Sequence, residues 1–88
     1  MTVSDERIVA AILDLLDRRG AGATICPSDV ARALASGESP WRALMPEVRR
    51  VAAALADAGS LRVSAHGEDV DALAARGPIR LGRPLSRG

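Results

Sequence analysis

The chain has 88 residues, 48% of them hydrophobic, and its formal net charge at pH 7 is +1. A chain of this length is too short for two independent cores and buries about 60–65% of its unfolded surface, so we expect one domain over residues 1–88. The near-zero net charge excludes a strong global attraction to DNA or to an acidic membrane.

The composition predicts an aliphatic core, because Trp41 is the only aromatic residue in the sequence. Helices rich in Ala approach closely and leave little volume between them, so no cofactor is expected. All twelve basic residues are Arg, which GC-rich codon usage explains as readily as a binding surface does. The basic surplus lies at the C-terminal end, where residues 76–88 contain four Arg and no acidic residue.

The sequence predicts a soluble cytoplasmic protein. Its one cysteine, Cys26, cannot form an intramolecular disulfide, which fits a reducing compartment. Charged residues at positions 5–7 interrupt the start of the chain, so no signal-peptide pattern is present. No apolar run reaches the length of a membrane span, and no membrane contact is expected.

Residues 5–19 are predicted to form the first helix. Thr2 begins a capping-box pattern, and Ser4 is an alternative N-cap. Gly20 follows the last turn, where a helix often ends on a residue with a left-handed backbone. The apolar residues that form the helical stripe are Ile8, Ile12, Leu15 and Leu16.

A short strand and a second helix are expected next. Residues 23–26 are β-branched in the middle and precede Pro27, which predicts one brief strand that pairs with a later hairpin. Ser28 is a good N-cap with Asp29 in the first turn after it, so we expect a helix from there through about Ser36.

Residues 40–59 contain the clearest amphipathic pattern in the chain. Proline inside a helix removes a hydrogen bond and costs about 3 kcal/mol, so Pro46 is expected to break or kink the segment. We predict a short helical turn at 41–45, then a longer helix over 46–58 in the position of a recognition helix. The residues expected to be buried there are Val48, Val51, Ala52 and Leu55.

The remaining sequence predicts a β-ribbon. Alternating apolar and polar residues at 61–66 indicate a half-buried strand, 66–69 a turn, and 79–81 the return strand. Between the turn and the return strand, residues 71–76 have the composition of a single helical turn.

The order helix, strand, helix, helix, strand, strand is that of a winged helix-turn-helix domain. We therefore predict an α+β fold, mostly α, in which a three-helix core carries a small antiparallel β-sheet and a wing. The ordered core is expected to span about residues 5–82, with residues 83–88 as a flexible tail.

Three short motifs resemble those of one family of short bacterial proteins. They are Pro-Ser-Asp-Val-Ala at 27–31, Trp-Arg-x-Leu-Met at 41–45 and Gly-Pro-Ile-Arg at 77–80. The family is known as domain of unknown function thirty-two fifty-three, and the resemblance runs from about Ile8 to Leu81. It implies a winged-helix variant and implies no catalytic residue.

Six arginines are candidates for contact with double-stranded DNA. Three lie on or beside the predicted recognition helix, where they would meet phosphates or bases of a major groove, and three lie in or after the wing. The alternative is that they are solvated or paired with acids, and Glu68, Asp69 and Asp71 are near the wing turn. The candidates are Arg42, Arg49, Arg50, Arg76, Arg80 and Arg83.

The other chemically distinctive residues have structural explanations. Trp41 is expected to anchor the junction between helices, although Trp is also common in binding hot spots. Cys26 is expected to be a small buried strand residue and His66 an exposed turn residue. Neither has the ligand spacing of a zinc site or the third member of a catalytic triad, so we predict no metal and no enzyme activity.

Two functions stay open. The element order, the Arg49–Arg50 pair and the basic end favour a small transcriptional regulator that binds DNA. Because a few phosphate contacts bind weakly, such a regulator would need a homodimer or a second domain. The near-neutral charge, the acidic wing turn and the Ala-rich outer face of the recognition helix favour a protein-interaction module that binds no nucleic acid.

Overall fold

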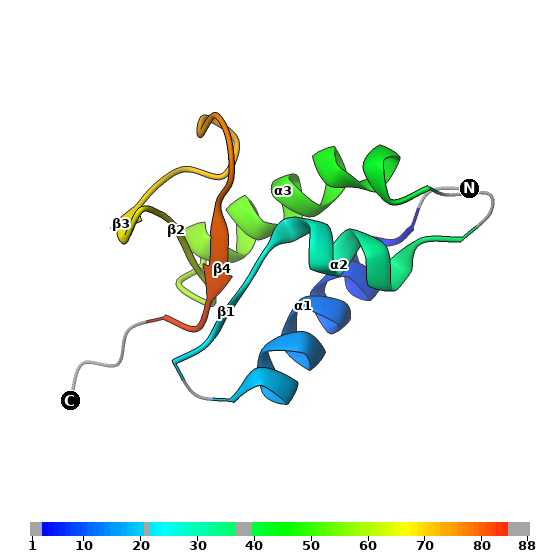
Figure 1. Cartoon of the computed structure of the whole chain (residues 1–88), viewed down its shortest axis with the longest axis horizontal. Coiled ribbons are helices and arrows are strands. Elements are labelled where there is room, and N and C mark those ends of the chain that lie inside the picture. Colours follow the sequence, from blue (N-terminus) through cyan, green and yellow to red (C-terminus); the bar gives the residue numbers. More distant parts are fainter. Residues whose placement is uncertain (1–2, 21, 37–39, 85–88) are drawn as a thin grey trace.

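The structure, a computed structural model, describes residues 3–20, 22–36 and 40–84. Within these ranges the chain forms three helices and four short strands in the order helix, strand, helix, helix, strand, strand, strand (Figure 1). The elements are α1 (Asp5–Arg19), β1 (Thr24–Ile25), α2 (Pro27–Leu34), α3 (Trp41–Asp57), β2 (Arg62–Ala65), β3 (Glu68–Asp69) and β4 (Arg80–Gly82).

Helix α1 begins at the second of the two predicted caps. The backbone N–H of Arg7 donates to Ser4 Oγ at 3.3 Å, so Ser4 is the N-cap. Thr2, the other predicted cap, lies outside the described residues. Ile8, Ile12 and Leu16 are buried as the helical spacing predicts. This stripe turns α1 toward the other two helices.

Helix α2 starts two residues earlier than predicted. Its N-cap is Cys26, whose backbone N–H donates to Asp29 Oδ2 at 3.0 Å, and Pro27 is the first helical residue. Proline suits that position, because its missing N–H would have no partner inside the helix. The prediction of Ser28 as N-cap is therefore wrong, as is the helix end near Ser36, since α2 ends at Leu34.

Helix α3 runs without interruption through Pro46, so the predicted division into a turn and a separate helix is wrong. Pro46 cannot donate to the carbonyl of Arg42, and the helix loses that one bond. The proline ring lies on the exposed side. Leu44 before it and Val48 after it are both buried, and this burial on either side outweighs the local cost.

The sheet is antiparallel, and its last strand in sequence lies inside it. The strand order is β1-β4-β2-β3, so β4 pairs with both β1 and β2. Leu81 is in register with Ile25 on one side and Val63 on the other, and all three are buried. This arrangement ties the first strand to the terminal hairpin, as predicted.

The turn of the ribbon is tighter than predicted. Only His66 and Gly67 form it, with φ of 52° and 82°, and Glu68–Asp69 then pair back onto β2 as strand β3. Two successive residues with positive φ are typical of a two-residue hairpin loop. The predicted helical turn is confirmed, because the N–H groups of Ala74 and Ala75 donate to the carbonyl of Asp71 at 3.1 and 2.8 Å.

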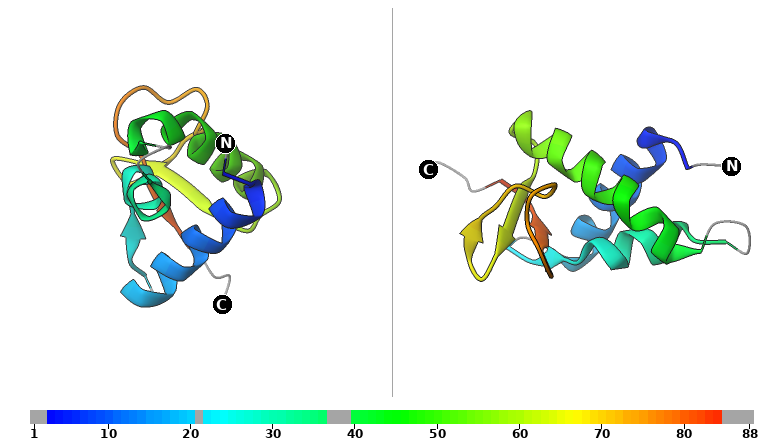
Figure 2. Two further views of the ribbon diagram at one scale, coloured as in Figure 1. Left: turned by 90° about the vertical axis from the view of Figure 1, so that its right-hand side faces the viewer. Right: turned by 90° about the horizontal axis from the view of Figure 1, so that it is seen from above.

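The three helices pack together, and the sheet covers one end of them (Figures 1 and 2). The core is aliphatic, as the composition predicts, and the partly buried Trp41 packs at its margin. The wing, defined here as residues 66–79, rises beside α3 in both figures. The largest fully buried side chains are Ile8, Ile12, Leu16, Ile25, Ile79, Leu81, Val30 and Val48. The predicted α+β winged-helix layout is confirmed.

Replacing Pro46 with alanine should stabilise the domain. The variant regains the N–H that donates to the Arg42 carbonyl, against some loss of rigidity in the unfolded chain, so we expect the free energy of unfolding to rise by about 1–2 kcal/mol. Thermal unfolding would show this as a higher Tm, by about 4–8 °C for each kcal/mol. The control is Pro40→Ala at the N-cap of α3, where the regained N–H has no acceptor within the helix. An unchanged or lower Tm for Pro46→Ala would contradict the cost assigned to the missing hydrogen bond.

Candidate binding surface

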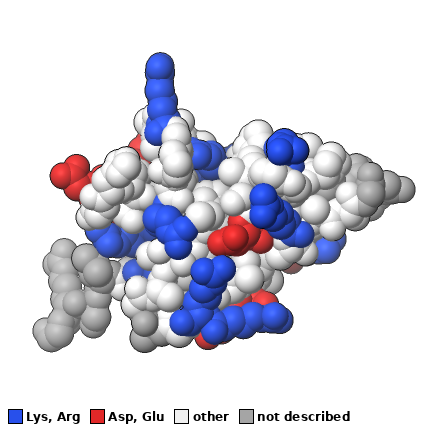
Figure 3. All heavy atoms as spheres, in the orientation of Figure 1, with Lys and Arg blue, Asp and Glu red and all other residues white. Residues whose placement is uncertain are grey.

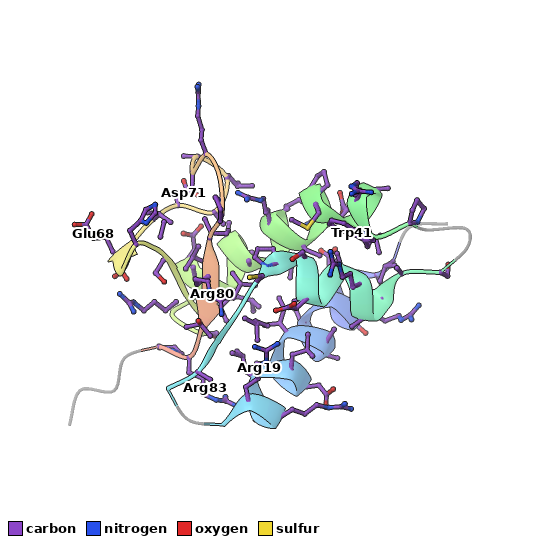
Figure 4. All side chains as sticks on the ribbon, viewed as in Figure 1. Arg19, Trp41, Glu68, Asp71, Arg80 and Arg83 are labelled. Atoms are coloured by element: carbon purple, nitrogen blue, oxygen red, sulfur yellow. The ribbon has the colours of Figure 1, made fainter. Side chains whose placement is uncertain are left out.

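The candidate surface is formed by α3 and the wing, which carry four of the six predicted DNA contacts. Figure 4 shows the side chains in place. The six arginines fall into two groups. Those bonded to other parts of the chain are Arg49, Arg50, Arg80 and Arg83. Those without a hydrogen bond or an ion pair to any residue that the structure describes are Arg42 and Arg76.

Arg49 fastens the wing to α3. Its Nη1 donates to the carbonyls of Ala72 and Ala75 at 3.4 and 3.3 Å, and its Nη2 donates to the carbonyl of Gly77 at 2.8 Å. The side chain is half-buried, and Ala72 is only 2% exposed. All three acceptors are neutral, so the guanidinium keeps an uncompensated positive charge while it orders the wing.

Arg50 is held between two carboxylates. Its Nη2 lies 2.6 Å from Asp5 Oδ1 of α1 and 2.7 Å from Glu47 Oε2 of α3, and its Nη1 donates to Asp5 Oδ2 at 3.1 Å. The hydrogen bonds from Arg50, with its charge, lower the pKa of Asp5, and both carboxylates raise the pKa of Arg50. Arg50 is exposed, but its charge is neutralised.

Arg80 and Arg83 join the C-terminal strand to earlier elements. Arg80 Nε and Nη2 donate to the hydroxyl and the carbonyl of Thr24, each at 2.9 Å, and its Nη1 contacts the sulfur of Cys26. Arg83 pairs with Asp17 of α1. The described part of the predicted tail, residues 83–84, thus contacts a helix, and residues 85–88 lie outside the described residues.

Trp41 is half-buried against the core and also carries two cations. The guanidinium carbons of Arg32 and Arg42 lie 4.6 and 4.7 Å from the centre of its ring. Contact with an aromatic ring leaves the charge of each guanidinium in place. The tryptophan therefore joins α2 to α3, as an anchor should, and holds two arginines beside the start of α3.

The acidic residues of the wing do not neutralise its free arginine. Asp69 pairs with Arg62 of β2 at 2.6 Å. Asp71 Oδ1 accepts from the backbone N–H of Leu73 at 2.9 Å and so stabilises the helical turn. The alternative that these acids pair with the wing arginines is therefore not observed for Arg76, within the part of the chain that the structure describes.

An apolar groove lies between the first half of α3 and the wing. We call it the α3–wing groove; its volume is about 510 Å³. Leu73 at its edge is 65% exposed, the most of any large hydrophobic residue described. Leu73 was not among the predicted site residues, and its only signal in the sequence is that of an isolated leucine in an otherwise small and polar turn. The lining residues are Arg42, Met45, Pro46, Arg49, Ala72, Leu73 and Ala75.

Cys26 and His66, the other chemically distinctive residues, lie in different parts of the fold. Cys26 is a half-buried helix cap beside Arg80 and not a strand residue, so that prediction is wrong. His66 is exposed in the turn, as predicted. Over residues 3–20, 22–36 and 40–84, no group of three or more His, Cys, Asp or Glu could hold a metal. None of the described helices is long and apolar enough to cross a membrane.

A comparison with protein families shows the family of the chain. The model of the family described as Protein of unknown function (DUF3253) matches residues 5–84. The chain belongs to this family. The match confirms the resemblance carried by the three motifs, and the family description assigns no activity to any residue. No curated protein matches the chain.

In this DUF3253 domain, replacing Arg49 with alanine should loosen the wing. Three carbonyls lose their donor, so we expect the free energy of unfolding to fall by about 1–3 kcal/mol, and Arg49→Lys should restore part of it. Urea unfolding measures the loss, and hydrogen exchange should show faster exchange at Ala74 and Ala75. Arg42→Ala, which removes the contact with the Trp41 ring, is the matched control on the same helix and should change the stability by less than about 1 kcal/mol. Equal losses in both variants would contradict the role of Arg49.

The Asp5–Arg50 pair should stabilise the domain only above acidic pH. Because the folded pKa of Asp5 lies below its usual value of 3.8, the contribution is present above that value and is lost as the pH falls through the folded pKa. We therefore expect Asp5→Asn to lower the Tm at neutral pH and to match the wild type in acid. Glu6→Gln, in the same helical turn, is the control. A Tm difference between wild type and Asp5→Asn that persists at the lowest pH would argue against this pair.

Proposed function

We propose that this DUF3253 domain is a winged-helix protein-interaction module without catalytic activity, whose binding face is formed by α3 and the wing. The observation that carries the proposal is the use of Arg49 and Arg50 inside the chain. Arg49 donates to wing carbonyls, and Arg50 is paired with Asp5 and Glu47. The hydrogen-bond donors that these two arginines would use to read bases are therefore engaged inside the chain, and the two carboxylates beside Arg50 would repel phosphate.

The distribution of charge supports the same function. On the face seen in Figure 3, basic side chains lie in separate groups with acidic side chains among them, not in one continuous band. DNA binders present a continuous positive surface to the phosphate backbone. An apolar groove beside an exposed leucine is instead typical of a surface that receives another protein.

DNA binding is the second candidate, because some basic groups near this face have no acidic partner among the described residues. Arg32 and Arg42 flank Trp41, and Arg76 lies in the wing. If all three neutralised phosphates, the logarithm of the association constant would fall with the logarithm of salt concentration at a slope of about −2.7. Such a monomer would bind DNA weakly and without sequence preference.

Photocrosslinking from the proposed face tests the function. A photoreactive amino acid in place of Leu73, in cells that express the chain, should yield adducts with protein and none with nucleic acid. The same substitution at Leu13 on α1, the other exposed large hydrophobic residue among those described, serves as the control. Adducts with nucleic acid from position 73 would contradict the proposal.

Binding to DNA can be measured directly. In fluorescence anisotropy with random-sequence duplex DNA, we expect no saturable binding at an ionic strength of about 0.15 M, where the exposed charges are screened. Saturable binding there, abolished in the double variant Arg42→Ala and Arg76→Ala, would favour the regulator over the interaction module.

A further inference from the structure

The α3–wing groove has the features of a pocket for one apolar side chain. Its apolar lining consists of Met45, Pro46, Ala72, Leu73 and Ala75. Leu73 is 65% exposed and lies outside the buried core. A partner side chain that fills the groove would cover Leu73 and remove apolar surface from water on both molecules.

The groove is already formed in the domain without a partner. Arg49 joins α3 to three carbonyls of the wing, and the buried Ala72 fixes the wing against the helix. The N–H of Leu73 is bonded to Asp71, which sets the leucine at the end of an ordered turn. A rigid site loses little conformational freedom on binding, and this favours affinity for a short segment.

The charge around the groove is positive. Arg42 and Arg49 line it, and Arg76 directly follows the lining residue Ala75 in sequence. None of these three arginines has a carboxylate partner among the residues that the structure describes. The lining contains no acidic residue. Two acids are adjacent to the lining in sequence: Glu47 is paired with Arg50, and Asp71 accepts the Leu73 N–H. A ligand with negative charge on either side of its apolar anchor would complement this distribution.

We propose that the α3–wing groove binds an acidic segment of a partner protein through one aliphatic or aromatic anchor flanked by carboxylates. The inference rests on the proposed interaction module and specifies the chemistry of its partner. The apolar lining of the groove, which includes Leu73, contacts the anchor. Arg42, Arg49 and Arg76 attract the carboxylates. Specificity comes from the apolar contact, whereas the arginines mainly raise the association rate and make it sensitive to salt.

Selection from a library of short random peptides displayed on phage tests this chemistry. The enriched peptides should pair acidic residues with one bulky apolar residue. A labelled peptide from this set should bind the wild type, and it should bind Leu73→Ser about tenfold more weakly, because the variant removes part of the apolar lining of the groove. Arg42→Glu should weaken binding about three- to tenfold at low salt and less at high salt.

Matched controls distinguish binding at this site from non-specific binding to exposed apolar or charged side chains. Leu13→Ser removes an exposed leucine from α1, and Arg7→Glu reverses a charge on the same helix. Both should bind the selected peptide within about twofold of the wild type. Enrichment of basic peptides, of peptides without an apolar anchor, or of none at all would overturn the inference, as would equal weakening in the controls.

The outcomes distinguish the inference from the proposed function. Protein adducts from position 73, together with peptides of different chemistry, would overturn only the partner chemistry. Adducts with nucleic acid would overturn both. If sedimentation shows self-association that Leu73→Ser abolishes, the occupant is a second copy of this chain, and the inference of an acidic segment falls.

Discussion

The contact of Arg49 with three wing carbonyls determines the shape of the surface that this domain presents. A wing of fourteen residues, 66–79, would move freely if only its hairpin turn were ordered. One half-buried guanidinium instead fixes its helical turn against α3. Because the acceptors are neutral, the same side chain both orders the wing and leaves positive charge at the groove. An aliphatic residue at position 49 would supply neither effect.

This use of arginine separates fold from function. The layout of three helices and a small sheet is shared by domains that bind nucleic acid and by domains that bind protein, so the fold alone does not decide between them. The decision rests on what the arginines of the face contact. Arg50 is neutralised by Asp5 and Glu47, and Arg80 and Arg83 connect strands and tail to the rest of the chain. What remains is a small, basic and partly apolar surface.

Local patterns in the sequence predicted most of the fold. Contacts between distant residues account for the continuity of α3 and the pairing of the arginines, whereas the start of α2 was missed within a local pattern. The stripe of Ile8, Ile12 and Leu16 and the order of elements follow from spacing within short segments. The continuity of α3 through Pro46 depends on burial against other elements, which a local rule about proline cannot include. Arg50 and Asp5 are 45 positions apart, and Arg80 and Thr24 are 56 apart. Their pairing, like the groove, becomes visible only after the chain has folded.

The outer strand β3 has a consequence for how the domain meets its own copies. It is two residues long, and both residues, Glu68 and Asp69, are exposed acids. An unpaired strand edge invites further strands to add to the sheet, and short charged edges prevent this. Two copies that approach through β3 would bring their Glu68 carboxylates together, because Asp69 is paired with Arg62. The sheet is thereby protected against growth into an aggregate at this edge, and association is directed to side chains elsewhere.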